Sequence, residues 1–334
     1  MTCRPLLALV AAALMACQSA PIGESRAVSA IPPGVGVGPR STFVIATPAG
    51  LLGLDEQGRT LGRIVALPSG ASPSAPAQHP DGKRIFFALS QVAETTGFGS
   101  DIYSVKLDGS DLRPLIRHEL PNVFYASPSF DTAGTYLYVH RRAAQEEVGN
   151  PGVYLQTEDS IERVDINTAD RQRVITDGAE PAVVPVGKSI VFVHLDRGQQ
   201  AGLWTAAVDG TRAEPLLKTG DRFWFLQAPR VSPSGRELVF SSAGRTRSFV
   251  PVSAGPRLAH LDIPSELYVA SLDGMSLRSI ATTMDDVVPA WSPDSSRIAY
   301  VALAQFYVIS ALEGNVISRT PASGFAYGDP VWLH

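Results

Sequence analysis

The chain has 334 residues, of which 45% are hydrophobic and 18% are charged, a composition that favours an ordered protein with a large core over a disordered one. The net charge of −4 provides no basic field that would attract nucleic acid. The two cysteines, Cys3 and Cys17, both precede the folded part, which excludes a structural disulfide and a cysteine-based zinc site there.

The first seventeen residues, MTCRPLLALVAAALMAC, contain one positive charge, Arg4, followed by an apolar stretch over residues 6–16. This stretch is too short for a permanent membrane-spanning helix and is typical of a secretory signal. It ends in Leu-Met-Ala-Cys17, which resembles the bacterial lipobox. The resemblance implies that a lipoprotein signal peptidase removes residues 1–16 and that Cys17 becomes the acylated first residue. The alternatives are an ordinary signal peptide, cut near Ala20, and an apolar core segment.

Gln18 follows the cysteine, and by analogy with enterobacterial sorting a residue other than Asp at this place favours the outer membrane. Residues 18–40 are rich in Ser, Ala, Pro and Gly and have no helical or strand period, which indicates a flexible tether. We therefore expect a signal peptide over 1–16, the acylated cysteine and tether over 17–41, and a folded domain over 42–334. The expected location is the cell envelope, as an outer-membrane lipoprotein that faces the periplasm or the cell surface.

A motif that starts with proline recurs along the folded domain. After each proline come a short apolar stretch, a turn with Gly or Ser, and further strands joined by hairpin turns. The intervals between these prolines are 52, 53, 48, 60 and 41 residues, and the prolines are Pro76, Pro128, Pro181, Pro229, Pro289 and Pro330. A repeat of this period and content predicts four-stranded sheets arranged radially, as in the blades of a propeller.

The two ends of the folded domain complement each other. The C-terminal GDPVWLH supplies a first strand with nothing after it, whereas FVIAT, GLLGLDEQG and LGRIVAL, from residue 43 on, supply the other three strands of a sheet. We expect the C-terminal strand to join the N-terminal sheet and leave no free edge. The predicted fold is therefore an all-β, six-bladed β-propeller with four-stranded antiparallel blades.

The segment Pro-Ala-Trp-Ser-Pro-Asp at 289–294, followed by Arg-Ile-Ala-Tyr at 297–300, resembles the repeat of TolB-type six-bladed propellers. Residues 228–240, APRVSPSGRELVF, match next best, and the resemblance covers nearly everything from residue 42. It implies the fold more than the function, because the same repeat occurs in envelope proteins and in the propellers of some peptidases. TolB itself has an α/β domain before its propeller, where we expect only the tether. The α/β-hydrolase domain of the peptidases has no counterpart in this sequence.

Motifs for catalysis are scarce. The sequence has neither the G-x-S-x-G nucleophile elbow nor H-E-x-x-H. His140 and His194 fall near the ends of second strands in adjacent blades, where we expect ordinary strand-end histidines. We predict hairpin turns rather than calcium loops at three Asp-Gly sites, Asp108, Asp209 and Asp273. We therefore expect no catalytic residue, no metal and no cofactor.

The candidate binding surface lies around the mouth of the central channel. Residues just before the first strands, among them Glu180, Tyr327 and Asp329, should ring this mouth on the face that carries the loops between second and third strands. Two of these loops are long, at 141–160 and 241–264. The predicted partner-binding residues are Phe223, Trp224, Phe225, Phe124, Tyr125, Arg141, Arg142, Arg245, Arg247, Asp285 and Asp286.

The run Phe223-Trp224-Phe225 stands out, because exposed aromatic residues are common anchors of protein interfaces. Strict alternation would bury Phe223 and Phe225 and expose Trp224, or the reverse. The alternative to a role in partner binding is that the run packs between blades. The four arginines would flank an acidic peptide, with ordinary solvated charges as the alternative.

These features lead to one hypothesis and one alternative. We expect a lipid-anchored, non-enzymatic and monomeric propeller that binds envelope proteins, Pal-like or other outer-membrane or periplasmic components, in a Tol–Pal-like or related assembly. The alternative is a channel-binding enzyme or sensor for a small molecule or glycan. An enzyme predicts polar side chains that converge in a bounded channel pocket, whereas a scaffold predicts an aromatic rim flanked by loops.

Overall fold

The computed structural model describes residues 36–149, 154–217, 223–243 and 264–334. Within these ranges the protein is all-β, apart from one short 3-10 helix, η1 (Gly38–Arg40). The predicted signal peptide, Cys17 and most of the predicted tether lie outside the described residues. None of the helical structure in the described part has the length and hydrophobicity needed to cross a bilayer.

The C-terminal strand pairs with the first strand of the folded part. β1 (Phe43–Thr47), β2 (Gly50–Leu54), β3 (Thr60–Arg63) and β24 (Asp329–Trp332) form one antiparallel sheet in the order β24-β1-β2-β3. Phe43 lies opposite Trp332 in this sheet, and the centres of their rings are 4.5 Å apart. The predicted pairing between the two ends of the folded domain is therefore present.

Three more sheets each contain four antiparallel strands in chain order. The first consists of β12 (Gly178–Val183), β13 (Ser189–Asp196), β14 (Gln199–Ala207) and β15 (Glu214–Pro215). The second consists of β16 (Gln227–Val231), β17 (Glu237–Ser242), β18 (Ser265–Ser271) and β19 (Leu277–Thr283). The third consists of β20 (Ala290–Trp291), β21 (Arg297–Ala302), β22 (Gln305–Ser310) and β23 (Val316–Pro321).

The remaining strands form a single sheet of eight. One half contains β4 (Ser72–Gln78), β5 (Arg84–Ala93), β6 (Gly97–Lys106) and β7 (Arg113–Ile116). The other half contains β8 (Val123–Phe130), β9 (Tyr136–Glu146), β10 (Tyr154–Asp165) and β11 (Arg171–Thr176). One parallel pair, Ser100 opposite Phe124, joins the two halves into one sheet, and each half repeats the antiparallel order of the other sheets.

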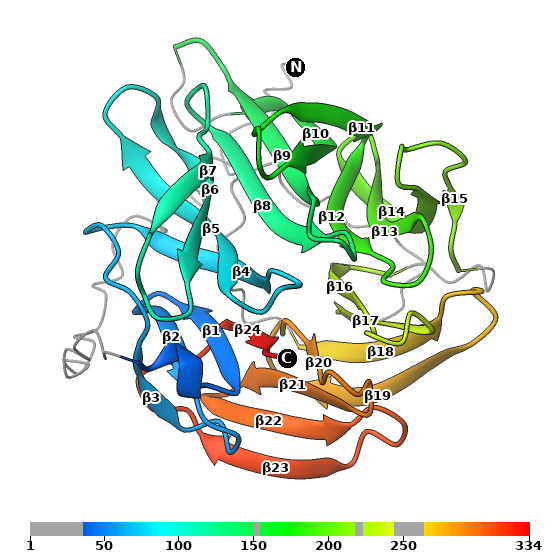
Figure 1. Ribbon diagram of the computed structural model, residues 1–334. Coiled ribbons are helices and arrows are strands. Elements are labelled where there is room, and N and C mark those ends of the chain that lie inside the picture. The colour runs from blue at the N-terminus through cyan, green and yellow to red at the C-terminus, as the bar shows by residue number, and fades with distance from the viewer. Residues whose placement is uncertain (1–35, 150–153, 218–222, 244–263) are drawn as a thin grey trace, which may run out of the picture. The chain divides into compact units, whose positions relative to one another are not determined.

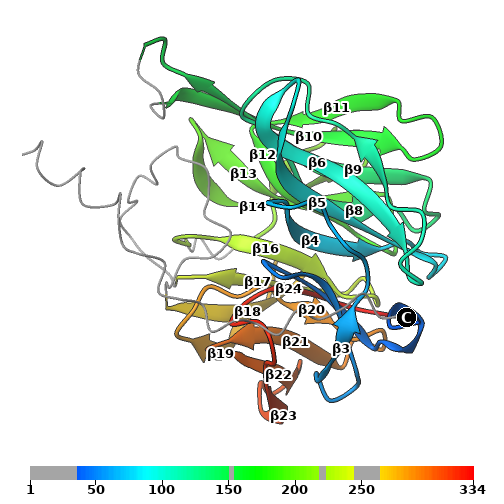
Figure 2. The ribbon, with the colours of Figure 1, turned by 90° about the vertical axis from the view of Figure 1, so that its left-hand side faces the viewer.

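The strands that contain or follow the repeated prolines lie around a common centre (Figure 1). Along the series β4, β8, β12, β16, β20 and β24, each strand contacts the next, and β24 also contacts β4. Figure 2, turned by 90°, shows β4, β16 and β24 between the sheets in the upper and lower halves of the view. The residues just before these strands are therefore brought toward the centre.

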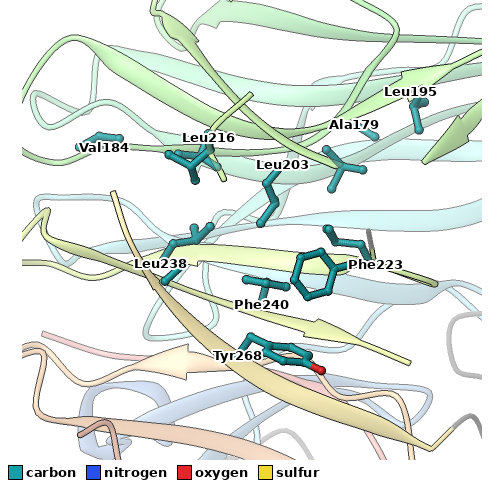
Figure 3. Packing of buried hydrophobic residues seen from close by; sticks show 13 residues of the cluster. Ala179, Val184, Leu195, Leu203, Leu216, Phe223, Leu238, Phe240 and Tyr268 are labelled. Atoms are coloured by element: carbon teal, nitrogen blue, oxygen red, sulfur yellow. The ribbon is translucent and has the colours of Figure 1, made fainter. Parts of the chain in front are cut away.

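Apolar side chains between adjacent sheets form the core. Figure 3 shows the cluster between the β12–β15 and β16–β19 sheets, which includes Leu203 and Leu238. The ring of Phe223 packs edge-on against those of Phe240 and Tyr268, with centroid distances of 5.0 and 5.2 Å. Strands such as β17 and β21 are apolar at consecutive positions because both of their faces are covered by neighbouring sheets.

The packed structure begins before the predicted boundary at residue 42. Val37, which the sequence analysis places in the tether, is buried in the cluster that contains Val44 and Leu51. Gly38 lies so close to the backbone of Leu107 that a Cβ atom would collide with its carbonyl oxygen. The last residues of the predicted tether are therefore part of the folded unit.

The Asp-Gly turns between third and fourth strands are hairpin turns, as predicted. In each turn the aspartate carboxylate accepts the backbone N–H of the residue two positions on. The glycine between them has a positive φ, between 72° and 84°, which a side chain disfavours. The aspartates are Asp108, Asp209 and Asp273.

Candidate functional site

Polar side chains from four of the central strands and the segments before them converge. Gln227, Asp286, Tyr327 and Asp329 line a cavity of about 40 Å³. Glu180, in β12, lies close enough to Asp329 to influence its ionisation. We call Glu180, Gln227, Asp286, Tyr327 and Asp329 the mouth residues.

The backbone beside the mouth residues departs from regular strand geometry at the same position in four strands. Four residues that directly precede a repeat proline have φ between 47° and 50°, a conformation that costs energy for any residue other than glycine. The strand register shifts at the same place in each of these strands, which marks a β-bulge. The residues are Ala75, Ser127, Glu180 and Ala228.

Two mouth carboxylates accept backbone N–H groups at these bulges. Asp329 Oδ2 accepts the N–H of Ala75 at 2.7 Å, and Glu180 accepts the N–H of Ala228. In each pair the carboxylate belongs to one sheet and the bulge to the next. The bulges therefore hold the carboxylates in fixed positions and join neighbouring sheets near the centre.

Burial shifts the pKa values of two charged side chains at the mouth, Asp329 and Arg230. Burial raises the pKa of Asp329, and the nearby carboxylates of Asp286 and Glu180 act in the same direction, whereas the Ala75 N–H and Arg230 oppose it. Burial lowers the pKa of Arg230, and Glu180 and Asp329 oppose that effect. The mouth thus holds three carboxylates beside one guanidinium.

Asp285 and Asp286 are adjacent in the sequence and both buried, but their carboxylates contact different groups. Asp285 is buried, and its Oδ2 accepts the N–H of Leu303 at 2.7 Å, which ties the β21–β22 turn to the segment before β20. Asp286 lines the cavity, where the amide of Gln227 donates to its Oδ2 at 3.4 Å. Of the two, Asp286 is thus the one at the mouth.

The aromatic run before β16 alternates between buried and accessible positions. Phe223 and Phe225 are each only 6% exposed, whereas Trp224 is half-buried. This pattern is the first of the two alternations that the sequence analysis allowed. Phe223 and Phe225 therefore pack within the protein, and Trp224 is the member of the run that a partner can reach.

Hydrogen bonds hold the backbone of this run in place. The side-chain amide of Gln200 exchanges two hydrogen bonds with the backbone of Leu226, at 2.5 and 2.7 Å. The carbonyl of Trp224 accepts the Ser242 hydroxyl at 2.6 Å and the Ala243 N–H at 2.9 Å. Trp224 Nε1 is buried and has no hydrogen-bond partner among the residues that the structure describes.

Arg141 and Arg142 lie in a strand, which corrects the predicted loop at 141–160. β9 and β10 continue past the expected strand ends, so that Arg141 lies opposite Ser160 and Arg142 opposite Asp159. The extension is stabilised because the charged side chains along it find partners on neighbouring strands. Most of the predicted insertion is therefore a longer β-hairpin.

The charged residues of this hairpin are paired within the protein. Arg141 donates to Glu119 Oε1 from two nitrogens, at 3.0 and 2.6 Å. Arg142 Nε and His140 Nε2 lie 3.0 and 2.7 Å from Asp159 Oδ1. Both arginines are thus held by acidic side chains rather than free to flank an acidic peptide.

Phe124 and Tyr125 also differ in accessibility. Tyr125 is fully buried, its hydroxyl donates to Glu119 Oε2 at 3.0 Å, and burial raises its pKa. Phe124 is half-buried and packs edge-on against Phe98, with ring centroids 5.4 Å apart. Arg245 and Arg247 lie outside the described residues.

The sequence analysis placed Glu180, Tyr327 and Asp329 at the mouth but missed Arg230 and the bulges. The proline was the only signal at each bulge, and a residue before proline ordinarily adopts an extended conformation. In the described ranges, no group of three or more His, Cys, Asp or Glu side chains is arranged to hold a metal.

No protein-family model matches the sequence, and no curated protein matches it. Among solved structures, TolB from Acinetobacter baumannii superposes with a TM-score of 0.61 and 17% identity, over 87% of this chain. TolB from Agrobacterium tumefaciens has a TM-score of 0.54 and 21% identity, over 76% of this chain and 87% of its own. This chain has a TolB-like propeller fold.

The TolB-like chain spans only 65% of the A. baumannii protein. A puromycin hydrolase also matches, with a TM-score of 0.51 and 12% identity, over 86% of this chain and 45% of its own. At these identities the comparisons establish the TolB-like fold and leave the function to be argued from the residues.

Proposed function

We propose that this chain is a lipid-anchored, non-enzymatic protein of the cell envelope, built as a closed six-bladed propeller. Closure is supported by the pairing of β24 with β1 and by the contacts of β24 with β4. Six blades are supported by the repeated strand order in both halves of the eight-stranded sheet. The lipobox at Cys17 and the TolB-like fold support the envelope location, and Gln18 favours the outer membrane.

The propeller's role, in this proposal, is to bind another envelope protein at the mouth of the channel. Trp224 is the observation that carries the proposal. Its backbone is fixed by Ser242 and Ala243, so a partner that contacts the indole need not order it. Its half-buried side chain leaves part of the apolar surface of the indole accessible to a partner. Such rigid aromatic residues are common energetic centres of interfaces.

The partner, in this proposal, is a Pal-like protein or another outer-membrane or periplasmic component of a Tol–Pal-like assembly. Trp224 lies three residues before Gln227. The carbonyl of Trp224 accepts the N–H of Ala243, and Ala243 directly follows β17. The partner would therefore contact the indole and the mouth residues together. Asp286 and Asp329 would present carboxylates to it.

The alternative, a channel-binding enzyme or sensor, has weaker support. Polar side chains do converge at the mouth, as an enzyme requires. The cavity they line measures about 40 Å³, however, which is room for about three water molecules rather than for a sugar ring. A ligand in the channel would need a wider mouth.

Photo-crosslinking from position 224 in intact cells tests the proposal. We expect a specific protein adduct, identified by mass spectrometry, and a loss of co-purification of that protein when Trp224 is changed to Ala. The control crosslinker replaces Met275, which is 72% exposed in the turn after β18. An adduct from both positions, or no adduct together with an unchanged phenotype for Trp224→Ala, would reject the mouth as the binding site.

A further inference from the structure

A second cavity lies between the β1–β2 turn and the segment that leads from β3 to β4. Its volume is about 170 Å³, several times that of the cavity at the mouth. Its lining is mostly small or apolar, with one charged side chain, Arg63 at the end of β3. The lining residues are Pro48, Ala49, Gly50, Arg63, Leu67, Pro68, Gly70 and Ala71.

The β1–β2 turn makes room for the side chain of Arg63. The hydroxyl of Thr47 donates to the carbonyl of Gly50 and accepts the N–H of Ala49, both at 3.1 Å, and so holds the turn closed. A Cβ atom at Gly50 would lie 3.6 Å from Arg63 Nε. The guanidinium stem thus passes directly over the glycine, and the turn forms one wall of the cavity.

The opposite wall is a second tight turn. The N–H of Ala71 donates to the carbonyl of Pro68 at 3.1 Å, and Gly70 between them has a φ of +77°. No atom lies within 4 Å of the position that a Cβ of Gly70 would occupy. This wall leaves open space, and a ligand can approach it.

Arg63 has no partner for its charge. Five arginines of the described chain have a buried nitrogen without a hydrogen bond: Arg63, Arg84, Arg141, Arg142 and Arg278. The other four all form an ion pair with an acidic side chain at 2.6 to 3.0 Å: Arg84, Arg141 and Arg278 through another nitrogen, and Arg142 through Nε itself. Arg63 has neither an ion pair nor a hydrogen bond to any described residue, and its buried atom is Nε.

A carboxylate matches what Arg63 presents. The guanidinium offers parallel N–H donors in a plane, which fit the two oxygens of a carboxylate. A partly buried guanidinium without a counter-charge is unfavourable, and an anion at its terminal nitrogens offsets that cost. The cavity is large enough for a carboxylate with the carbon atoms next to it.

We propose that this cavity binds a carboxylate group through the terminal nitrogens of Arg63. The group is supplied either by a polypeptide, as an acidic side chain or a C-terminus, or by a small organic acid. This site is separate from the mouth residues and does not depend on Trp224 as a partner contact. Failure of either proposal would therefore leave the other standing.

Sodium acetate is the first probe, titrated into the purified protein at constant ionic strength against sodium chloride. The Nε–H resonance of Arg63 and the backbone N–H resonance of Gly70 in the cavity wall, observed by NMR, should shift saturably with acetate and not with chloride; Gly70 is the reporter in the variant that lacks Arg63. Arg63→Lys keeps the charge but loses the planar fork, and we expect it to weaken binding about tenfold. The control is Arg113→Gln, which removes the same charge from the edge strand β7, where the side chain is 64% exposed; it should leave the titration unchanged.

Three further titrations separate the sources of the carboxylate. N-acetyl-alanine represents a C-terminus, N-acetyl-aspartate amide represents an acidic side chain, and succinate represents a small organic acid. Tighter binding of one of them than of acetate names the source. A linear response to acetate, an equal response to chloride, or a saturable response that persists unchanged in Arg63→Lys would overturn the proposal.

Discussion

At the scale of single residues, the Trp-Ser-Pro-Asp motif at 291–294 has a structural explanation. Trp291 Nε1 donates to the carbonyl of Arg230 at 2.8 Å, and so links the β20 sheet to the β16 sheet. The hydroxyl of Ser292 donates to Asp294 at 2.5 Å and accepts the N–H of Arg297 at 2.9 Å. The motif therefore closes a turn and fastens one sheet to the next.

Asp294 gives a prediction for pH dependence. Hydrogen bonds from the Ser292 hydroxyl, and then from the N–H and hydroxyl of Ser296, lower its pKa from 3.8 to about 2. Because the pKa is lower in the folded protein, the ionised carboxylate stabilises the fold above about pH 4, and this contribution is lost as the pH falls toward 2. The side chain is exposed, so we expect Asp294→Asn to cost no more than about 1 kcal/mol at pH 7.

Urea unfolding of the wild type and of Asp294→Asn at several pH values measures this effect. The difference in free energy of unfolding should shrink between pH 4 and pH 2. Ser292→Ala removes the main donor, and in that background Asp294→Asn should have a smaller effect. A difference that grows as the pH falls would contradict the assignment.

At the scale of elements, the turns between third and fourth strands pack against the preceding sheet. A Cβ atom on Gly210 would lie 1.8 Å from the carbonyl oxygen of Val174 in β11. Gly109 and Gly314 approach Ile64 and Ile280 in the same way, at 2.2 and 1.9 Å. Glycine recurs in these turns because of this contact as well as because of its backbone conformation.

Gly210→Ala should therefore destabilise the protein by more than the cost of placing alanine at a positive φ. Gly198 is the matched control, because its φ of 76° is close to the 84° of Gly210, while the nearest atom to its added Cβ is 3.6 Å away. Each substitution costs about 1–2 kcal/mol for the left-handed backbone. Gly210→Ala should cost about 1–3 kcal/mol more, since two sheets must separate. Equal free energies of unfolding for the two variants would contradict this prediction, because they would show that the two sheets separate without a cost in free energy.

Strand positions were predictable from local patterns to different degrees. The repeat prolines located all the central strands, and the complementary ends located the pairing of β24 with β1. The length of the β9–β10 hairpin was not predictable in this way. Arg141, Arg142 and Asp159 have the polar character of a loop, but they lie in paired strands, where Glu119 neutralises Arg141 and Asp159 neutralises Arg142.

At the scale of the whole molecule, the pairing of β24 with β1 is the contact that spans nearly the full folded chain. Val44 and Val331 lie opposite each other in this pair. If the pairing persists in solution, cysteines at these two positions should form a disulfide when Cys3 and Cys17 are replaced by Ser. Because the enclosed loop is long, the oxidised form should exceed the reduced form in free energy of unfolding by about 4 kcal/mol.

Gel mobility and urea unfolding of the oxidised and reduced forms measure the result. The single variant Val44→Cys should show no difference between the two conditions. Cysteines that stay reduced under oxidising conditions would count against a propeller closed by its C-terminal strand.

The sequence by itself determined the repeat, the turns and the strand order, because these depend on spacing and on local backbone preferences. Only the tertiary structure decided that Trp224 is accessible while Phe223 is buried. It also decided that Arg63 lacks a counter-charge among the described residues while Arg141 has one. The burial of a side chain and the pairing of its charge are set by neighbouring sheets. Those neighbours are distant in the sequence, so no local pattern records them.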